Sequence, residues 1–468
     1  MDNELLCFTP ATELLRLMRA RALSPVEIMK AVVARSQALN PALNFLCTET
    51  YDSALTQARQ AEDALMRGDA HGLLHGLPVT LKDLSLTQGV RTMGGSFMYE
   101  RRVPAINHVH VERLQNAGAI SIGKTTVSEL GWSGVSRSPV TGITHNPWKC
   151  GMNAGASSAG AGVGAAAGIG PLHQGSDGAG SVRMPAAFCG VYGLKPSFGR
   201  VPYHPTPNNG LISHVGPLTR TVADAALMTM AMAGEDLRDQ WSLPGAVEDY
   251  LTGLDAGVRG LRVAYSPDLG HLRVDAVVAQ RVAAAVKVFE DLGCKVDEVD
   301  PGWGDTSAME AILFAGAYAA QLGHELERWA DRMDPGLVAL TRHGLTLSAA
   351  DYGRAQAQRL ALWDQMHALF QRYDLLLTPS LSVVAFPAAQ LMPSHWPQHA
   401  WDWLQWAGFS YPFNLTGLPA ATCPCGFSDD GLPIGLQIVA GRWQDKRVLQ
   451  ASHAFEQARP WAQYRPPV

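Results

Sequence analysis

Two loops of small residues carry the serines best suited to act as nucleophiles. The first runs from Gly155 to Gly160 (GASSAG) and the second from Gly175 to Ser181 (GSDGAGS). Glycine and alanine allow close approach of the backbone, and successive N–H groups beside a serine can stabilise an oxyanion. Close packing of helices on a sheet also favours small residues, but it does not explain a serine in each loop. The pattern therefore indicates acyl-transfer chemistry.

A serine nucleophile needs a base, and the usual histidine arrangements are not found. The sequence contains no clean G-x-S-x-G. The pairs His71/His75 and His395/His399 are each four apart, but glycine or proline lies between their members and argues against a stable helix. H-E-x-x-H is also absent. We therefore predict no zinc site and no other metal site.

Lys82 is the remaining candidate for the base. It ends the apolar segment LPVTLK, where its side chain could meet the two serine loops. Lysines usually lie at the surface, and the sequence alone leaves that alternative open. Burial disfavours the charged form, so a buried Lys82 would lose its proton near neutral pH and could act as a base.

These residues must be positioned by secondary structure, and the chain alternates between helices and strands. Ser24 and Pro25 are suited to begin one of two or three amphipathic helices expected in residues 10–67. Strands are predicted over 77–84, 119–123, 259–266, 373–381 and 432–441, and helices over 109–118, 281–293 and 445–458. An Ala-rich helix and a short strand should separate the two serine loops. This alternation predicts an α/β sheet covered on both faces.

The segment GAISIGKTT, Gly118–Thr126, matches the phosphate-loop pattern G-x-x-x-x-G-K-[ST]. A working phosphate loop lies between a strand and the helix that follows it. Here the four variable positions alternate as in a strand, and the predicted helix precedes them. We interpret the match as a strand that ends near Lys124 and not as a nucleotide site.

Composition narrows the class of protein. Of 468 residues, 47% are hydrophobic and 17% charged, so most of the chain should fold. The net charge of −5 and the lack of a basic stripe argue against a nucleic-acid partner. No signal peptide and no apolar run of spanning length are apparent, and the seven cysteines are scattered. We expect a cytoplasmic protein with free thiols and no membrane contact.

The chain resembles the amidase signature family over nearly its whole length. The resemblance is densest at GLPVTLKDL, GAISIGKTT, residues 151–200 and the segment from YPFNLTGLPAATCPCGF to GLPIGLQIVAG. It implies an α/β fold built on a large mixed, twisted sheet covered by helices on both faces. It also implies one domain: N-terminal helices (1–67), a signature core (75–230), a variable substrate-side region (231–410) and a C-terminal core segment (411–468).

The resemblance assigns a role to each candidate. Lys82 matches the base, Ser157 the bridging serine and Ser181 the nucleophile of a Ser–Ser–Lys triad, and the spacings between them fit. The peptide bond before Ser157 is expected to be cis. The remaining implied positions are the oxyanion-hole amides of Gly178, Ala179, Gly180 and Ser181, the supporting residues Asp177, Arg183 and Ser158, and the pocket residues Trp132 and Ser133.

Three alanines depart from the family pattern. Ala156 and Ala159 replace glycines of G-G-S-S-G-G, and Ala179 replaces a glycine of the second loop. Alanine disfavours positive φ, so the loops would have to differ if the family needs such angles there.

The implied activity is hydrolysis of an amide without a cofactor. Trp396, Trp401, Trp403 and Trp406 form either packing under a long loop or an aromatic pocket wall, and they favour a hydrophobic amide, anilide or carbamate. Esters should react by the same chemistry. Many relatives dimerise, so a homodimer is compatible with the resemblance.

Two alternative functions share the fold. One is the glutaminase-type component of a tRNA-dependent amidotransferase, but the segment after GRV does not match that branch. The other is a non-catalytic relative that binds small molecules, which would be expected to lack a triad member.

Overall fold

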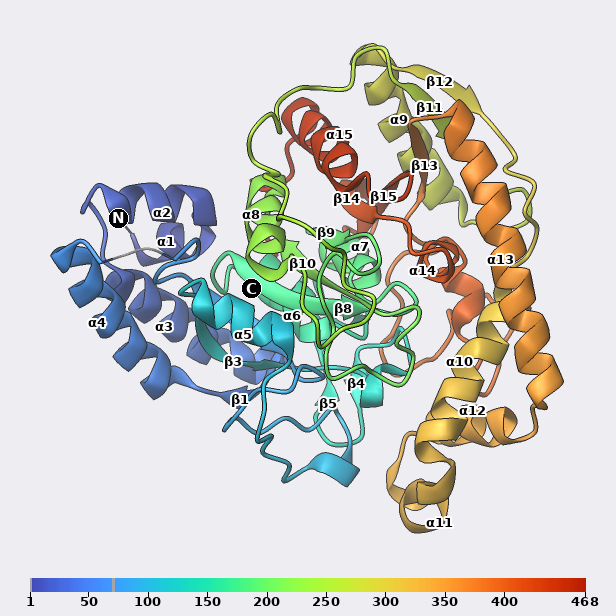
Figure 1. The fold of residues 1–468 in the computed structure, drawn as a ribbon, viewed down its shortest axis with the longest axis horizontal. Coiled ribbons are helices and arrows are strands. Elements are labelled where there is room, and N and C mark those ends of the chain that lie inside the picture. The colour runs from blue at the N-terminus through green and yellow to red at the C-terminus, as the bar shows by residue number, and fades with distance from the viewer. Residues whose placement is uncertain (1, 70–71) are drawn as a thin grey trace.

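The computed structural model describes residues 2–69 and 72–468, and it is organised around one large sheet (Figure 1). The sheet has 11 strands in the order β1-β3-β2-β8-β10-β9-β14-β15-β13-β11-β12. These strands are β1 (Leu46–Glu49), β2 (Pro78–Lys82), β3 (Ile120–Thr125), β8 (Leu172–Asp177), β9 (Tyr192–Lys195), β10 (His214–Thr219), β11 (Arg262–Tyr265), β12 (Lys295–Glu298), β13 (Leu375–Pro379), β14 (Ala420–Phe427) and β15 (Pro433–Ala440). Two small sheets pair β4 (Arg137–Ser138) with β5 (Gly142–Ile143) and β6 (His145–Asn146) with β7 (Lys149–Asn153).

The large sheet is mixed. Strand β2 is parallel to both β3 and β8, and β11 is parallel to both β12 and β13. The strands between these two groups, from β8 to β13 across the sheet, pair antiparallel. The predicted large mixed sheet is confirmed. Its C-terminal strands β14 and β15 lie in the middle, so the last part of the chain completes the core.

Helices cover both faces of the sheet, as the alternation of apolar residues along β15 requires. Leu436 and Ile438 pack in one apolar cluster with residues of α9 (Ala276–Asp291) and α15 (Asp445–Ala458). Val439, between them in alternation, packs in another cluster with residues of α7 (Arg183–Cys189). Because neighbouring strand residues point to opposite faces, both faces of this strand are buried.

The N-terminal helices gather beside β1 and β3 at one end of the sheet (blue in Figure 1). They are α1 (Asn3–Phe8), α2 (Ala11–Arg19), α3 (Pro25–Leu43) and α4 (Tyr51–Arg67). The predicted start of α3 is confirmed: Ser24 Oγ accepts from Val26 N at 2.9 Å, and the Glu27 carboxylate accepts from Ser24 N at 2.9 Å. This reciprocal cap satisfies amides that a helix start otherwise leaves unbonded.

A layer of helices from residues 307–372 covers the opposite end of the molecule (yellow to orange in Figure 1). It consists of α10 (Ser307–Leu322), α11 (Leu326–Trp329), α12 (Pro335–Leu345) and α13 (Ala349–Arg372), with the 3₁₀ turns η3 (Gly323–Glu325) and η4 (Ala330–Arg332). The other helical elements are α5 (Val109–Asn116), α6 (Ala159–Ala166), α8 (Val222–Met232), α14 (Pro412–Leu415), η1 (Phe97–Tyr99), η2 (Glu129–Gly131) and η5 (Leu404–Ala407). None of the helices in the described ranges has the length and apolar character needed to cross a membrane.

The phosphate-loop match is a strand, as predicted. Ile120–Thr125 form β3, and α5 precedes it. Lys124 is buried, and its ammonium donates to Ser85 O, to Thr87 Oγ1 at 2.7 Å and to Thr92 Oγ1 at 3.2 Å. A phosphate-binding lysine must reach a ligand, whereas all three N–H donors of Lys124 are bonded to the protein.

Candidate active site

Strand β2 delivers Lys82 to the serine loops. The side chain is fully buried, and Nζ donates to Ser157 Oγ at 2.8 Å and to Ser176 O at 3.0 Å. The backbone of Lys82 is held as well, because its N–H donates to Gln174 Oε1 at 3.0 Å on the neighbouring β8. The strand therefore fixes both the height and the direction of this side chain.

The surroundings of Lys82 favour its neutral form. Burial lowers the pKa of Lys82 to about 7, against a weaker opposing effect of the Asp177 carboxylate. A charged ammonium has three N–H donors to satisfy, and Lys82 has two acceptors in the described part of the chain. A neutral amine donates two hydrogens and keeps one lone pair. Near neutral pH, a substantial fraction of Lys82 can accept a proton.

The two serine loops are held against each other by Ser158. Its N–H donates to Ser181 O at 3.2 Å, and its hydroxyl donates to Ser176 O at 3.2 Å. The peptide bond between Ala156 and Ser157 is cis, as expected. Ser157 and Ser181 both line one cavity of about 250 Å³. The structure therefore brings Lys82, Ser157 and Ser181 to a common site.

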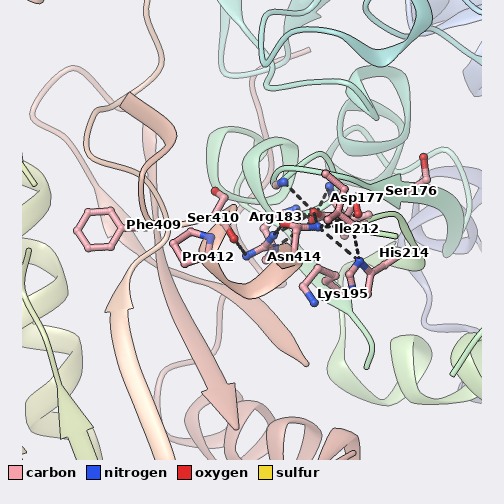
Figure 2. Close-up of polar contacts among 12 residues, drawn as sticks. Ser176, Asp177, Arg183, Lys195, Ile212, His214, Phe409, Ser410, Pro412 and Asn414 are labelled. Carbon is pink, nitrogen blue, oxygen red and sulfur yellow. Dashed lines mark hydrogen bonds and ion pairs between the residues drawn. The ribbon is translucent and has the colours of Figure 1, made fainter. Parts of the chain in front are cut away.

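Asp177 organises the turn that carries Ser181. Its carboxylate accepts from Gly180 N at 2.7 Å and from Val182 N at 3.1 Å, and it forms a buried, two-point ion pair with Arg183 at 2.9 and 3.0 Å (Figure 2). Burial alone would raise the pKa of Asp177, but the Arg183 guanidinium overcomes that effect and lowers it well below the usual range. Asp177 is thus a fixed anion around which the turn folds.

The structure divides the four amides expected to form the oxyanion hole into two kinds. The Gly180 N–H donates to Asp177, and Gly180 is not among the cavity-lining residues. Gly178, Ala179 and Ser181 line the cavity. The difference arises because an aspartate three residues before Gly180 offers a strong acceptor within the turn. Three of the four residues therefore border the space where a substrate carbonyl would lie.

The alanines that replace family glycines occupy ordinary backbone conformations. Ala156, Ala159 and Ala179 have no positive φ, whereas Gly155 and Gly180 have φ angles of 75° and 113°. A Cβ at Gly180 would also lie 2.6 Å from the side chain of Ser410. The sequence thus keeps glycine at these two strained positions, and the expected conflict does not occur.

Three residues from the C-terminal part of the chain complete the turn, and sequence reasoning gave them no role. Arg183 Nη1 donates to Ser410 O and to Gln437 Oε1, each at 2.8 Å, and Nη2 donates to Asn414 Oδ1 at 2.6 Å (Figure 2). Asn414 Nδ2 donates to Asp177 O at 2.9 Å. The one signal was that Ser410, Asn414 and Gln437 lie within or beside the quoted C-terminal segments.

The family model for amidases matches residues 27–449 of this chain. The chain belongs to the amidase signature family. It is 38% identical to an acylamidase of Rhodococcus erythropolis, and the alignment covers 100% of this chain and 98% of the relative. It is 33% identical to the amidase-type component of the glutamyl-tRNA(Gln) amidotransferase of Thermosynechococcus vestitus, over 97% of this chain and 98% of the relative.

Solved structures of amidase signature enzymes share the whole fold. A bacterial aryl acylamidase of the family superposes with a TM-score of 0.91 at 30% identity, covering 98% of this chain and 97% of that one. A 6-aminohexanoate cyclic dimer hydrolase superposes with a TM-score of 0.90 at 26% identity, covering 98% and 99%. The chain is therefore an amidase-family enzyme, a hydrolase that acts on amides.

The pocket residues expected from the family resemblance do not reach the cavity. Trp132 and Ser133 are buried and absent from its lining, which instead includes Leu130 and Gly131 from the same segment. Leu130 and Gly131 have φ angles of 50° and 79°, and this turn presents them to the cavity. Trp132 packs behind them against Gly336. The correction shifts the pocket wall by two positions along the sequence.

The Trp-rich segment of this amidase signature chain serves both purposes that the sequence left open. Trp403 lines the cavity, and its Nε1 donates to Trp132 O at 2.8 Å. Trp406 is buried and stacks on Phe188 with ring centres 6.0 Å apart, and the remaining tryptophans are not in the cavity lining. One tryptophan is therefore a pocket wall, and Trp406 is packing behind it.

The histidine pairs form no metal site among the described residues. His71 lies outside those residues, and the ring of His75 contacts Ala61 O at 2.9 Å. His395 contacts the Asp275 carboxylate at 2.9 Å. His399 Nδ1 accepts from Asp402 N at 2.8 Å. All seven cysteines are free thiols, as the sequence led us to expect.

Proposed function

We propose that this enzyme hydrolyses hydrophobic amides, including anilides, through an acyl-enzyme on Ser181. The observation that carries the proposal is the 2.8 Å contact between the buried Lys82 amine and Ser157 Oγ, beside a cavity that exposes both serines. A buried lysine that contacts a serine hydroxyl has few structural reasons to be there, because burial costs it solvation. Its value lies in accepting a proton.

The relay begins with neutral Lys82, which takes a proton from Ser157 while Ser157 takes one from Ser181. Ser181 Oγ then attacks the amide carbonyl carbon. The amides of Gly178, Ala179 and Ser181 are the donors we assign to the oxyanion, and Gly180 keeps the turn in shape through Asp177. Removing one donor of such a set typically costs about 10²–10³ in rate.

Collapse of the tetrahedral intermediate needs a proton on the leaving nitrogen, because an amide anion is a poor leaving group. Ser157 supplies that proton and is reprotonated by the Lys82 ammonium. The C–N bond then breaks, the amine departs and the acyl group stays on Ser181. Water attacks the ester by the same relay and releases the carboxylic acid.

The walls of the cavity support a hydrophobic or aryl substrate. Its lining includes Leu84, Leu86, Leu130, Phe314 and Trp403. Such side chains bury apolar groups at about 25 cal/mol for each Å² removed from water. The relatives named acylamidase and aryl acylamidase support the same class. We extend the proposal to carbamates and esters, since attack occurs at the same carbonyl carbon.

A glutaminase function within an amidotransferase is the second candidate, because a relative from such a complex is 33% identical. Glutamine carries an α-ammonium, which needs an acidic partner when it is bound out of water. No aspartate or glutamate lines the cavity within the described residues. This charge pattern favours the acylamidase function. Measurable release of ammonia from glutamine by the isolated chain would support the alternative.

The test is hydrolysis of 4-nitroacetanilide, an aryl carbamate and an aryl ester by wild type and Ser181→Ala. We expect a loss of at least about 10³-fold in kcat for the variant, because no nucleophile remains. Ser53→Ala, at an exposed serine on α4, is the matched control and should retain full activity. Mass spectrometry of wild type quenched during ester turnover should show an acyl adduct on the Ser181 peptide. Equal rates for wild type and Ser181→Ala on every substrate would disprove the proposal.

A further inference from the structure

The active-site cavity is lined by one charged side chain among the described residues, that of Arg102. His108, which also lines it, is neutral: burial is the main reason that its pKa falls to about 3. Its Nδ1 accepts from Leu86 N at 2.7 Å, so its Nε2 carries the hydrogen that points to Pro205 O at 3.1 Å. The electrostatic character of the cavity is therefore set by a single cation.

The Arg102 side chain is held in place without using the end of its guanidinium. Nε donates to Thr92 O at 2.9 Å, and Thr92 N donates back to Arg102 O at 3.0 Å. The guanidinium lies over the ring of Tyr99, 4.1 Å from its centre. These contacts fix the plane of the guanidinium, so little side-chain entropy remains to be lost when a ligand binds.

The terminal nitrogens of Arg102 have no partner within residues 2–69 and 72–468. Nη1 and Nη2 carry four of the five N–H donors, and neither makes a hydrogen bond to the protein. No carboxylate in that part of the chain lies within ion-pair distance, although Arg102 is half-buried. A half-buried guanidinium that stays charged and leaves its donors unused is a poor structural element.

We propose that Arg102 binds a carboxylate carried by the substrate at a distance from the scissile amide. This inference rests on the proposed amidase function and narrows its substrates to acidic amides, such as an N-acyl aminobenzoate or the anilide of a dicarboxylic acid. A carboxylate fits the planar fork of arginine with two parallel hydrogen bonds. The apolar lining around the cation holds the rest of the molecule and weakens competition from water.

Two pairs of substrates test the inference from either side of the amide. On the amine side, 4-acetamidobenzoate is compared with 4-acetamidobenzamide. On the acyl side, N-phenylsuccinamate is compared with N-phenylsuccinamide. Within each pair only the charge changes, at nearly constant size. We expect wild type to favour the carboxylate of at least one pair by about 10–100-fold in kcat/KM, the range of a charged hydrogen-bonded contact.

The preference should depend on Arg102 and not on net charge. In Arg102→Met the preferred pair should fall to a ratio near one, while the carboxamide is hydrolysed at close to the wild-type rate. Arg101→Met removes a neighbouring exposed arginine and should keep the wild-type ratio. Arg102→Lys keeps the charge without the planar fork, so it should show an intermediate preference even if the methionine variant folds poorly.

A binding measurement separates this inference from the proposed function. Calorimetry of Ser181→Ala with the preferred carboxylate, and of the double variant with Arg102→Met, needs no catalysis. Binding that weakens at least tenfold in the double variant supports the inference even if wild type hydrolyses nothing. Equal rates for carboxylate and carboxamide in both pairs, or equal ratios in Arg102→Met and Arg101→Met, would overturn it while leaving the amidase function intact.

Discussion

Two buried lysines lie at the ends of neighbouring parallel strands, and only one of them contacts a serine of the active site. Lys82 ends β2, and Lys124 lies one position before the end of β3, with Leu81 opposite Lys124 across the pair. Both side chains are fully buried. Lys124 donates to three acceptors, whereas Lys82 donates to two, one of which is Ser157 Oγ.

The comparison teaches that burial alone does not make a lysine a base. Burial lowers the pKa of Lys124 to about 8, with the nearby Asp83 opposing the effect, and it lowers that of Lys82 to about 7. The pKa values are similar, but the functions that we assign differ. Lys124 uses all its hydrogens to tie the segment 85–92 to the sheet. Lys82 keeps a position open toward a hydroxyl that needs a proton acceptor.

Substitution of Lys82 should have the largest effect on activity. In Lys82→Met the relay loses its proton acceptor, so kcat should fall by about 10²–10⁴-fold on amides. Methionine fills the space of the alkyl chain, and we expect cooperative unfolding to be preserved. Steady-state rates with 4-nitroacetanilide and a thermal melt measure both. A variant that keeps wild-type kcat would show that Lys82 resembles Lys124.

Substitution of Lys124 should affect stability instead. Lys124→Met leaves three buried acceptors and the Asp83 carboxylate without their cation, which should lower the free energy of unfolding by about 3–5 kcal/mol. The folded fraction should keep kcat within about threefold of wild type. Urea unfolding and rates corrected for folded protein provide the measurement. Loss of kcat comparable to Lys82→Met, in a folded sample, would erase the distinction between the two lysines.

The pH dependence of the rate should report Lys82 alone. Because the relay needs the neutral amine, kcat/KM for a neutral anilide should rise with pH and level off above about 7. One pH unit below that value, the rate should be about tenfold lower than the plateau. The same profile measured on Lys124→Met should show an unchanged midpoint. A midpoint that moves with Lys124 would contradict the assignment.

The pH dependence of stability offers the smallest but most direct comparison. Unfolded Lys82 keeps its proton to about its ordinary pKa of 10.5, while the folded form releases it near 7. Between these values the unfolded chain binds more protons, so Lys82 makes the free energy of unfolding rise with pH, by up to about 1.4 kcal/mol per unit. Below pH 8 the folded Lys124 is mostly protonated and adds little to this slope.

Urea unfolding of wild type and Lys82→Met between pH 7 and 8 isolates that slope. Buried Glu129 and Glu310 have pKa values raised by burial to about 7 and about 8, and they act with the opposite sign. Their effect is common to both proteins and cancels in the difference. An identical slope in wild type and variant would mean that folded Lys82 keeps its proton as Lys124 does.

Local patterns in the sequence predicted the elements that carry the site. Ser24 and Pro25 marked the start of α3, and the alternation in AISIG identified β3 despite its resemblance to a phosphate loop. These signals are reliable because caps and strand alternation depend on neighbouring residues. The family resemblance then pointed to Lys82, Ser157 and Ser181, which lie at one site in the structure.

Contacts between distant segments could not be predicted in this way. Nothing local indicates that Gly180 donates to Asp177 while Ala179 faces the cavity, or that Leu130 replaces Trp132 at the pocket wall. Each depends on the path of a turn within the folded protein. The role of Asn414 was hidden for the same reason, since its partners Asp177 and Arg183 lie more than 200 positions away.

That separation has a consequence for how the enzyme comes into being. The turn that bears Ser181 is held by Ser410, Asn414 and Gln437, and the strands β14 and β15 occupy the middle of the sheet. During synthesis Lys82, Ser157 and Ser181 emerge long before these partners. The nascent chain therefore carries its full catalytic triad in a latent state. Hydrolytic activity appears only when the last part of the chain has joined the sheet, and fragments that end before it remain inert.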